Sequence, residues 1–313
     1  MSSPVQLSRT AGPSWGFAFL ASAQRWVPDW LLRPALKAGT WVAVARMPAQ
    51  RRYSREFLSF VLGRPAGLLD VWRHFFAFLE LMMMRLRLAG GGAPNCALAP
   101  GEGREFEDLL ESGEPALFGT FHFGHSDLLG FLLGARRRRV AMIRLRVENS
   151  PDLEQFSRQF GRWVSFIWVN EPANLLFAVK TAIDEGASLA MQCDRQEYAA
   201  RTEDFQFLGE RRIFPFTIYH LACLFNLPVV FCLGLPDGRG GTSVLASPVF
   251  RPDGGTREEN LQRARDHFQA VLTRLEGLVR RYPVLWFNFR PLNPVAGPTR
   301  RLSATPPVAE GRS

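Results

Sequence analysis

The segment His122-Phe-Gly-His-Ser-Asp127 places a carboxylate five positions after a histidine. The apolar run before it is typical of a strand that ends at about Phe121, and Ser126 can cap a helix that holds Asp127 in its first turn. We therefore expect His122 and Asp127 to meet at the carboxyl end of a strand, where open α/β sheets bind ligands. A carboxylate there can accept one ring N–H and leave the other nitrogen free as a base. The spacing predicts that His122 is a general base and that Asp127 orients it.

The same segment lacks a covalent nucleophile. Gly124-His125-Ser126 is not followed by x-Gly, so the nucleophile-elbow motif is absent. The acceptor, a hydroxyl or an amine, would then attack the acyl carbon directly after His122 has taken its proton. A thioester suits this chemistry because thiolate is a good leaving group and no covalent enzyme intermediate is needed. We expect backbone amides near Gly124 to stabilise the oxyanion that forms.

His122, His125 and Asp127 superficially resemble a metal cluster. A binuclear hydrolase requires the pattern H-x-H-x-D-H, whereas these histidines are three positions apart and Leu128 follows the aspartate. Zinc would also need further ligands, and the remaining histidines are scattered along the chain. The sequence predicts no metal and no cofactor, and a metal-dependent hydrolase is kept as an alternative.

Short apolar runs alternate with amphipathic helical segments after residue 100. Strands are expected at 116–121, 139–143, 163–169, 188–193, 228–233 and 243–246. Helices are expected at 127–133, 151–160, 173–185, 214–225 and 257–281. This alternation predicts an α/β domain over 101–291, with a mostly parallel central sheet flanked by helices. A linker over 89–100 precedes this domain, and the composition of the tail over 292–313 predicts disorder.

Residues 1–90 are expected to form an apolar, helical, membrane-interface region that precedes the α/β domain. Pro28, Pro34, Pro48 and Pro65 should divide it into short helices. Over 26–46 and 69–88, basic residues are spaced among apolar ones, which is typical of helices that lie in a membrane interface. Packing of the same helices on the core is the alternative. No run of about 20 apolar residues occurs, so we expect no membrane-spanning helix.

The net charge of +9 comes almost wholly from arginine, because Lys37 and Lys180 are the only lysines. Such an excess predicts an anionic partner: a membrane surface, an acidic acyl carrier protein or a nucleic acid. No base-stacking or groove-reading motif accompanies it, so nucleic acid is not expected. Arg211 and Arg212, in the polar stretch that follows Asp194, can grip a phosphate bidentately, with exposed loop charge as the alternative. Four cysteines without C-x-x-C spacing favour a reduced, cytosol-facing protein.

The H-x-x-x-x-D arrangement from His122 to Asp127 resembles the signature of the lysophospholipid acyltransferase superfamily, and its surroundings are similar to the bacterial lipid A late-acyltransferase branch. Similar segments follow in order: 149–162 ending in Gly-Arg, 186–194, 207–209, and the closing segment that contains Trp286. The likeness spans roughly residues 71–291. It implies a glycerolipid acyltransferase-like fold, with Arg162 beside the acceptor phosphate or the oxyanion and Asp194 as an active-site aspartate.

The acceptor is left open by this resemblance. The lipid A branch usually carries glutamate at the position of Asp127, and the FPEGTR phosphate motif of the glycerolipid branch is absent. The resemblance implies transfer of a fatty acyl group from acyl carrier protein or coenzyme A to a hydroxyl of a membrane glycolipid similar to a lipid A precursor. A lysophospholipid or other lipid acceptor is the alternative. It further implies a peripheral or monotopic enzyme on the cytoplasmic face of the inner membrane. The competing hypothesis is a non-catalytic membrane-binding protein on the same fold.

Overall fold

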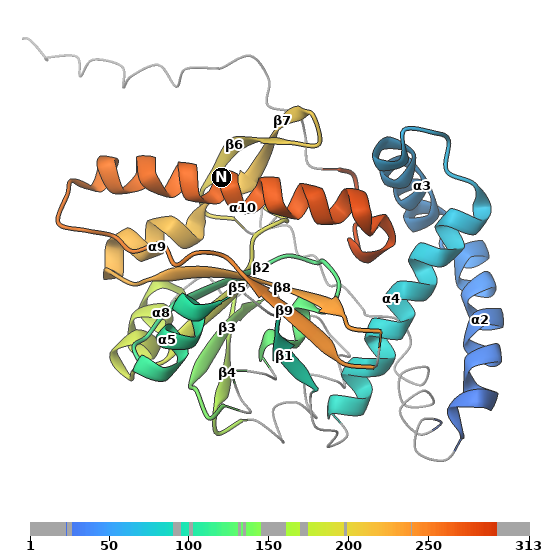
Figure 1. Ribbon diagram of the computed structural model, residues 1–313, viewed down its shortest axis with the longest axis horizontal. Coiled ribbons are helices and arrows are strands. Elements are labelled where there is room, and N and C mark those ends of the chain that lie inside the picture. The colour runs from blue at the N-terminus through green and yellow to red at the C-terminus, as the bar shows by residue number, and fades with distance from the viewer. Residues whose placement is uncertain are drawn as a thin grey trace, which may run out of the picture.

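Seven strands form one central sheet in the computed structural model, with helices on both faces and the described N-terminal helices, α2 to α4, at one side (Figure 1). The structure describes residues 23, 27–89, 95–99, 103–130, 133, 136–144, 161–169, 175–196, 199–238 and 240–292, without the side chains of Asp29, Ala89 and Asp127. The α/β class and the mostly parallel, helix-flanked sheet predicted from the sequence are confirmed.

The strands are β1 (Cys96–Leu98), β2 (Leu117–Thr120), β3 (Val140–Arg144), β4 (Val164–Trp168), β5 (Ser188–Gln192), β6 (Thr202–Phe207), β7 (Glu210–Pro215), β8 (Val229–Pro236) and β9 (Thr242–Ala246). The helices are α2 (Asp29–Arg46), α3 (Pro48–Leu62), α4 (Leu68–Ala89), α5 (Arg104–Ser112), α8 (Leu175–Asp184), α9 (Thr217–Phe225) and α10 (Arg257–Arg281), with short 3-10 turns η1 (Ser126–Leu128) and η4 (Pro283–Leu285). The strands expected from the six apolar runs are all present.

The sheet has the order β1-β9-β8-β2-β5-β3-β4. Strands β8, β2, β5, β3 and β4 run parallel to one another, whereas β9 is antiparallel to β8. The carboxyl ends of these five parallel strands therefore lie along one edge. The loops that follow β2 and β5 meet at this edge, because β2 and β5 are direct neighbours.

Alternate residues of the central strands pack into two hydrophobic cores, one on each face of the sheet. Phe118 and Val230 pack on one face with Phe106 of α5. On the other face, Phe231 packs against Phe268 of α10, with ring centroids 5.3 Å apart. Helices α9 and α10 cover this second face, opposite α5 (Figure 1). The parallel sheet is thus buried on both sides, as its near-continuous apolar strands require.

The N-terminal helices pack on the end of the α/β region rather than standing apart from it. Phe57 of α3 is 1% exposed and meets the indole ring of Trp286 edge-on, at 5.2 Å between ring centroids. His74 of α4 is fully buried and stacks on Phe289 at 4.3 Å. Helix α2 lies on the outer side of α4 (Figure 1). No helix among the described residues has the length and apolar character needed to cross a membrane.

Three sequence-based expectations are corrected by the structure. Pro34 lies inside α2 instead of ending a helix, at the cost of one helical hydrogen bond to the carbonyl of Trp30. The end of the expected linker forms β1, which pairs with β9. The polar stretch after Asp194 is an antiparallel hairpin, β6–β7, rather than a loop.

Two other expected elements are described only in part or not at all. The expected helix over 127–133 begins as the short turn η1, and its later residues are only partly described. The expected helix over 151–160 and residues 293–313 of the tail lie outside the described residues.

Gly119→Ala is expected to lower the free energy of unfolding by about 1–3 kcal/mol, the usual cost of overpacking a core. Gly119 lies in β2, and a Cβ atom there would approach the ring of Phe231 to 2.3 Å. Urea denaturation measures the change. Gly39→Ala in α2, where a Cβ meets nothing within 4 Å, is the control and should not destabilise the protein. An unchanged urea midpoint for Gly119→Ala would contradict the tight packing of β2 against β8.

Candidate active site

His122 and Asp194 leave the sheet side by side. Thr120 and Gln192 are paired in the register of β2 and β5, and His122 and Asp194 each follow two positions later. The Nδ1 atom of His122 lies 2.7 Å from Oδ1 of Asp194. The backbone N–H of His122 donates to Oδ2 of the same carboxylate at 2.8 Å. Two hydrogen bonds, one from the ring and one from the backbone of His122, thus hold the histidine against the Asp194 carboxylate.

The Asp194 carboxylate is ionised although its side chain is only 3% exposed. Burial by itself raises the pKa of this group, but His122, Arg195 and a hydrogen bond from Trp286 together hold the pKa well below its usual range. The indole N–H of Trp286 donates to Oδ2 at 3.1 Å. An ionised carboxylate only accepts hydrogen bonds, so the Nδ1 atom of His122 carries the proton.

The other ring nitrogen of His122 is therefore the basic one. Nε2 forms no hydrogen bond with any residue that the structure describes, and the side chain is 18% exposed. A neutral imidazole held in this tautomer has its lone pair on Nε2. The arrangement can accept a proton from a hydroxyl that reaches the sheet edge, while Asp194 stabilises the imidazolium that results.

The segment after α10 pairs with the His122 loop. Phe123 and Trp286 form an antiparallel bridge. The N–H of Phe287 donates to the His122 carbonyl at 2.8 Å, and the N–H of Gly124 donates to the Leu285 carbonyl at 2.7 Å. Trp286 therefore reaches Asp194 from a segment that is itself bonded to the residues around His122.

Gly124 has a structural role at the end of β2. Its φ is +52°, and a Cβ atom would lie 2.2 Å from the carbonyl oxygen of Gly234 in β8. That carbonyl accepts the N–H of His125 at 2.8 Å. The amides of Gly124 and His125 both donate to protein carbonyls and so are not free for an oxyanion, whereas the role expected for backbone amides near Gly124 in general stays a prediction.

Asp127 follows in η1, and its side chain lies outside the described part of the structure. The contact with Nδ1 of His122, which the spacing assigned to Asp127, is made by Asp194. The role of Asp127 stays a prediction, whereas Asp194, taken from the family resemblance alone, lies at the centre of the site.

Arg162 is placed at the opposite edge of the sheet from His122. Arg162 lies two residues before β4. In the sheet, the first residue of β4, Val164, pairs with Val140 of β3, and Val140 pairs with Ser188 of β5. Asp194 lies beyond the carboxyl end of β5, six residues after Ser188 and therefore about 20 Å further along the strand direction at about 3.3 Å per residue. The prediction that Arg162 binds a phosphate or the oxyanion at this site is therefore wrong. The Arg162 guanidinium lies over the ring of Trp163 instead.

Arg211 and Arg212 both lie in β7 and have partners within the protein. Arg211 is exposed and forms an ion pair with Asp204 across the hairpin. Arg212 is buried, pairs with Glu210, and places its guanidinium 5.2 Å from the ring centroid of Phe60 in α3. No contact joins either arginine to His122 or Asp194 within the described residues, so phosphate binding by them is not supported.

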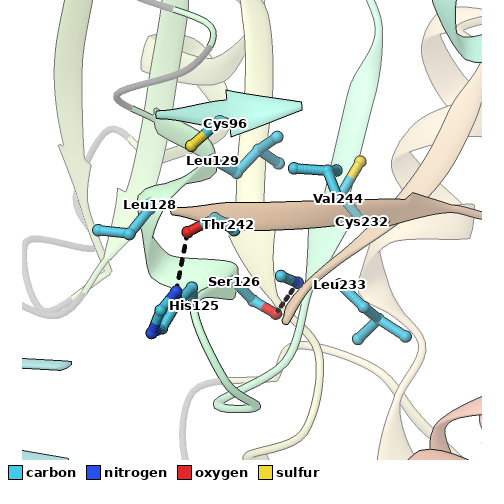
Figure 2. Close-up of a pocket in the computed structure, with 10 residues that line it drawn as sticks. Cys96, His125, Ser126, Leu128, Leu129, Cys232, Leu233, Thr242 and Val244 are labelled. Atoms are coloured by element: carbon cyan, nitrogen blue, oxygen red, sulfur yellow. Dashed lines mark hydrogen bonds between the residues drawn. The ribbon is translucent and has the colours of Figure 1, made fainter. Parts of the chain in front are cut away.

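His125 lines a separate small cavity, beside Thr242 of β9 (Figure 2). Its Nδ1 atom lies 2.8 Å from the hydroxyl of Thr242 in β9, beside a cavity of about 10 Å³ lined also by Cys96 and Cys232. Burial lowers the pKa of His125 to about 4, so it is neutral at pH 7. Across the described ranges, no group of three or more His, Cys, Asp or Glu side chains is placed to hold a metal ion.

A second cavity adjoins the carboxyl ends of β2, β3 and β5. It has a volume of about 20 Å³. Its lining includes Thr120, Leu129, Met142, Ile143, Met191 and Gln192. His122 and Asp194 do not line this mainly apolar cavity, but Thr120 and Gln192, two residues before them, do, so the cavity lies at the same end of the strands as the pair.

The sequence did not predict the hydrogen bonds of two further residues. Trp286, in the closing segment of the resemblance, is by its sequence more readily a core side chain than acyl-chain lining, and a lone histidine in an apolar helix, His74, gave no sign that it contacts this segment. The available signal was weak: both are hydrogen-bonding side chains in otherwise apolar stretches, where a buried polar group needs a partner.

Gly124→Ala is expected to destabilise the protein by about 2–4 kcal/mol, since left-handed strain adds to a collision with the Gly234 carbonyl. Gly113→Ala is the matched control: its φ is +71° but a Cβ there meets nothing within 4 Å, so only the strain of about 1–2 kcal/mol should appear. Chemical denaturation compares the two. Equal losses would show that the β2 loop is not held by its close approach to β8.

No protein-family model and no curated protein matches the chain.

Proposed function

We propose that the protein is an acyltransferase that moves a fatty acyl group from a carrier thioester to a hydroxyl of a membrane lipid. The observation that carries this proposal is the contact between Nδ1 of His122 and the buried, ionised carboxylate of Asp194. It leaves a basic nitrogen at the carboxyl edge of a parallel sheet, where α/β proteins bind ligands. The similarity of the H-x-x-x-x-D segment to the lysophospholipid acyltransferase superfamily supports the acyltransferase-like fold and the reaction class.

The reaction needs one proton relay and no covalent enzyme intermediate. Nε2 of His122 takes the proton of the acceptor hydroxyl while the hydroxyl oxygen attacks the thioester carbon. The tetrahedral intermediate collapses as its C–S bond breaks, and the imidazolium returns the proton to the leaving thiolate. The products are an ester and a free thiol. Asp194 stabilises the imidazolium, and the indole of Trp286 keeps the carboxylate in place.

The apolar cavity beside the pair supports a substrate with a hydrocarbon chain. Leu129, Met142 and Met191 line it, and methionine side chains adapt readily to the shape of a ligand. Its volume of about 20 Å³ is that of a single water site, so an acyl chain would enter only as these side chains move apart. As acceptor we propose a glycolipid similar to a lipid A precursor, with acyl carrier protein or coenzyme A carrying the donor thioester.

Exposed apolar side chains on the N-terminal helices support peripheral binding to the cytoplasmic face of the inner membrane. Trp30 of α2 is 73% exposed. Other exposed apolar residues of α2–α4 and the segments between them are Leu31, Trp41, Val42, Met47, Phe60, Leu68, Leu69 and Phe78. Arg51, Arg52 and Arg55 line a hollow at the start of α3, where they can meet anionic headgroups. Apolar residues with basic neighbours are typical of interfacial helices.

His122→Ala is expected to lower the rate of thioester turnover by about 10²–10⁴, the usual contribution of a general base. Asp194→Asn should lose a comparable factor, because the amide cannot stabilise the imidazolium. Thiol release from acyl-coenzyme A and from acyl carrier protein, each in the presence of lipid extract, measures the rate. His220→Ala, on α9 and outside the site, is the control. Retained turnover in His122→Ala would refute the mechanism, and Asp127→Asn tests separately whether Asp127 also acts on His122.

Deletion of the protein from its host is expected to remove one acyl chain from a glycolipid. Mass spectrometry of extracted lipids identifies the acceptor by the mass that is lost. Loss of a chain from a phospholipid would assign the alternative acceptor class, and an unchanged set of lipids would contradict acyl transfer altogether.

Replacement of Trp30 and Leu31 by serine is expected to weaken binding to anionic phospholipid vesicles by roughly tenfold or more, because two exposed apolar side chains are lost from the interface. Co-sedimentation with vesicles measures the binding. Leu224→Ser on α9 is the matched control, since Leu224 is 61% exposed but lies outside the N-terminal helices. Equal effects of both variants would argue against the N-terminal helices as the membrane-binding surface.

A further inference from the structure

A continuous path of hydrogen bonds joins the N-terminal helices to the His122–Asp194 pair. The hydroxyl of Ser54 in α3 lies 2.8 Å from Nδ1 of His74 in α4. Nε2 of His74 lies 2.9 Å from the backbone carbonyl oxygen of Trp286. The indole N–H of Trp286 then donates to Asp194. Ser54 and His74 are both 0% exposed, so water does not compete for these bonds.

The direction of each bond is fixed by the chemistry of the groups. A carbonyl oxygen only accepts, so the proton of the His74 ring is on Nε2 and donates to Trp286. Nδ1 of the neutral ring must then accept from the hydroxyl of Ser54. Burial lowers the pKa of His74 to about 4, which keeps the ring neutral at pH 7. Both ring nitrogens are therefore used, and the ring has one favoured orientation.

Trp286 is held at its backbone and at its side chain. Phe57 and Phe207 meet its indole edge-on, at 5.2 and 5.3 Å between ring centroids. Its carbonyl accepts from His74, and its backbone is bridged to Phe123. Since carbonyl and indole belong to one residue, the bond from His74 also constrains where the indole N–H points.

We propose that His74, supported by Ser54, is a positioning residue of the active site, which fixes Trp286 so that its indole holds Asp194 against His122. It touches neither His122 nor Asp194 and acts through Trp286. The inference deepens the proposed function and rests on it only for the activity measurement below. Because Ser54 lies on α3 and His74 on α4, both helices would then help to orient the basic side chain of His122.

His267 provides a matched control within the same protein. Its Nδ1 atom lies 2.5 Å from the hydroxyl of Tyr219, and its Nε2 atom lies 2.8 Å from the carbonyl oxygen of Pro248. His74 and His267 thus have the same pair of partners, a hydroxyl and a carbonyl. Only the carbonyl bonded to His74 belongs to a residue that contacts Asp194.

The test follows the Nδ1 proton of His122 by NMR in the full-length protein. A ring proton bonded to a buried carboxylate resonates far downfield, and its absence in His122→Ala assigns it. His74→Phe keeps an aromatic ring but removes both hydrogen bonds, and we expect the resonance to move and its exchange with solvent to quicken. His74→Gln, whose amide can donate to the Trp286 carbonyl, should restore the wild-type signal in part. His267→Phe should leave the resonance unchanged, whatever it does to the melting temperature.

A double-variant comparison separates positioning from general destabilisation. Trp286→Phe removes the indole donor, so adding His74→Phe to it should cause little further change in the resonance. If His74→Phe does not fold, Ser54→Ala, which removes only the hydroxyl, should move the resonance in the same direction by less. An unmoved resonance in the folded His74 or Ser54 variant, additive shifts in the double variant, or an equal shift in His267→Phe would each overturn the inference.

The activity measurement is kept separate from the NMR measurement. With palmitoyl-coenzyme A as the probe, His74→Phe is expected to lower kcat by about 10- to 100-fold with little change in KM, because the base is misplaced while substrate binding is retained. If the wild-type protein releases no thiol from palmitoyl-coenzyme A or from acyl carrier protein, the proposed function fails. The NMR comparison still decides whether His74 positions His122.

Discussion

The candidate site depends on keeping the carboxylate of Asp194 charged although it is buried. Removing an ionised carboxylate from water costs several kcal/mol unless donors replace the lost hydration. Asp194 receives three hydrogen bonds, from the ring and the backbone of His122 and from the indole of Trp286. These donors are 72 and 92 residues from Asp194 in the sequence. The charge is therefore stable only when β2, β5 and the segment after α10 are assembled together.

Elements with strong local signals were predicted closely from the sequence. The helix expected over 257–281 has these bounds because Thr256 forms a capping box with Glu259 and basic residues occupy the last turn. The buried parallel strands appear as short apolar runs. The hairpin β6–β7 was not predicted, because the exposed positions of both strands are polar. The two strands pair with each other across the turn at Leu208 and Gly209. A three-residue strand such as β1 gives almost no periodic pattern.

The candidate site was predicted in part. The position of His122 after a strand followed from local sequence, but its bonded carboxylate did not. The choice between Asp127 and Asp194 depends on the register of Thr120 against Gln192, a non-local pairing that one sequence does not reveal. The same limit explains the error for Arg162. Order along the chain says nothing about which edge of a sheet a residue occupies, and Arg162 precedes its strand whereas Asp194 follows its own.

The packing of α3 indicates that the N-terminal helices and the region around His122 and Asp194 stabilise each other. Phe57 and Leu58 of α3 belong to the same hydrophobic core as Trp286 and Phe268, so α3 contributes to the core of the α/β region. Without α3 and α4, the Trp286 carbonyl would lose the N–H of His74 and keep only that of Asn288, and the indole would lose one of its two edge-on neighbours. A displacement of these helices would therefore move Trp286, whose indole donates to Asp194, and Phe287, whose backbone N–H donates to His122. The packing of α3 and α4 and the orientation of the His122–Asp194 pair are linked through this segment.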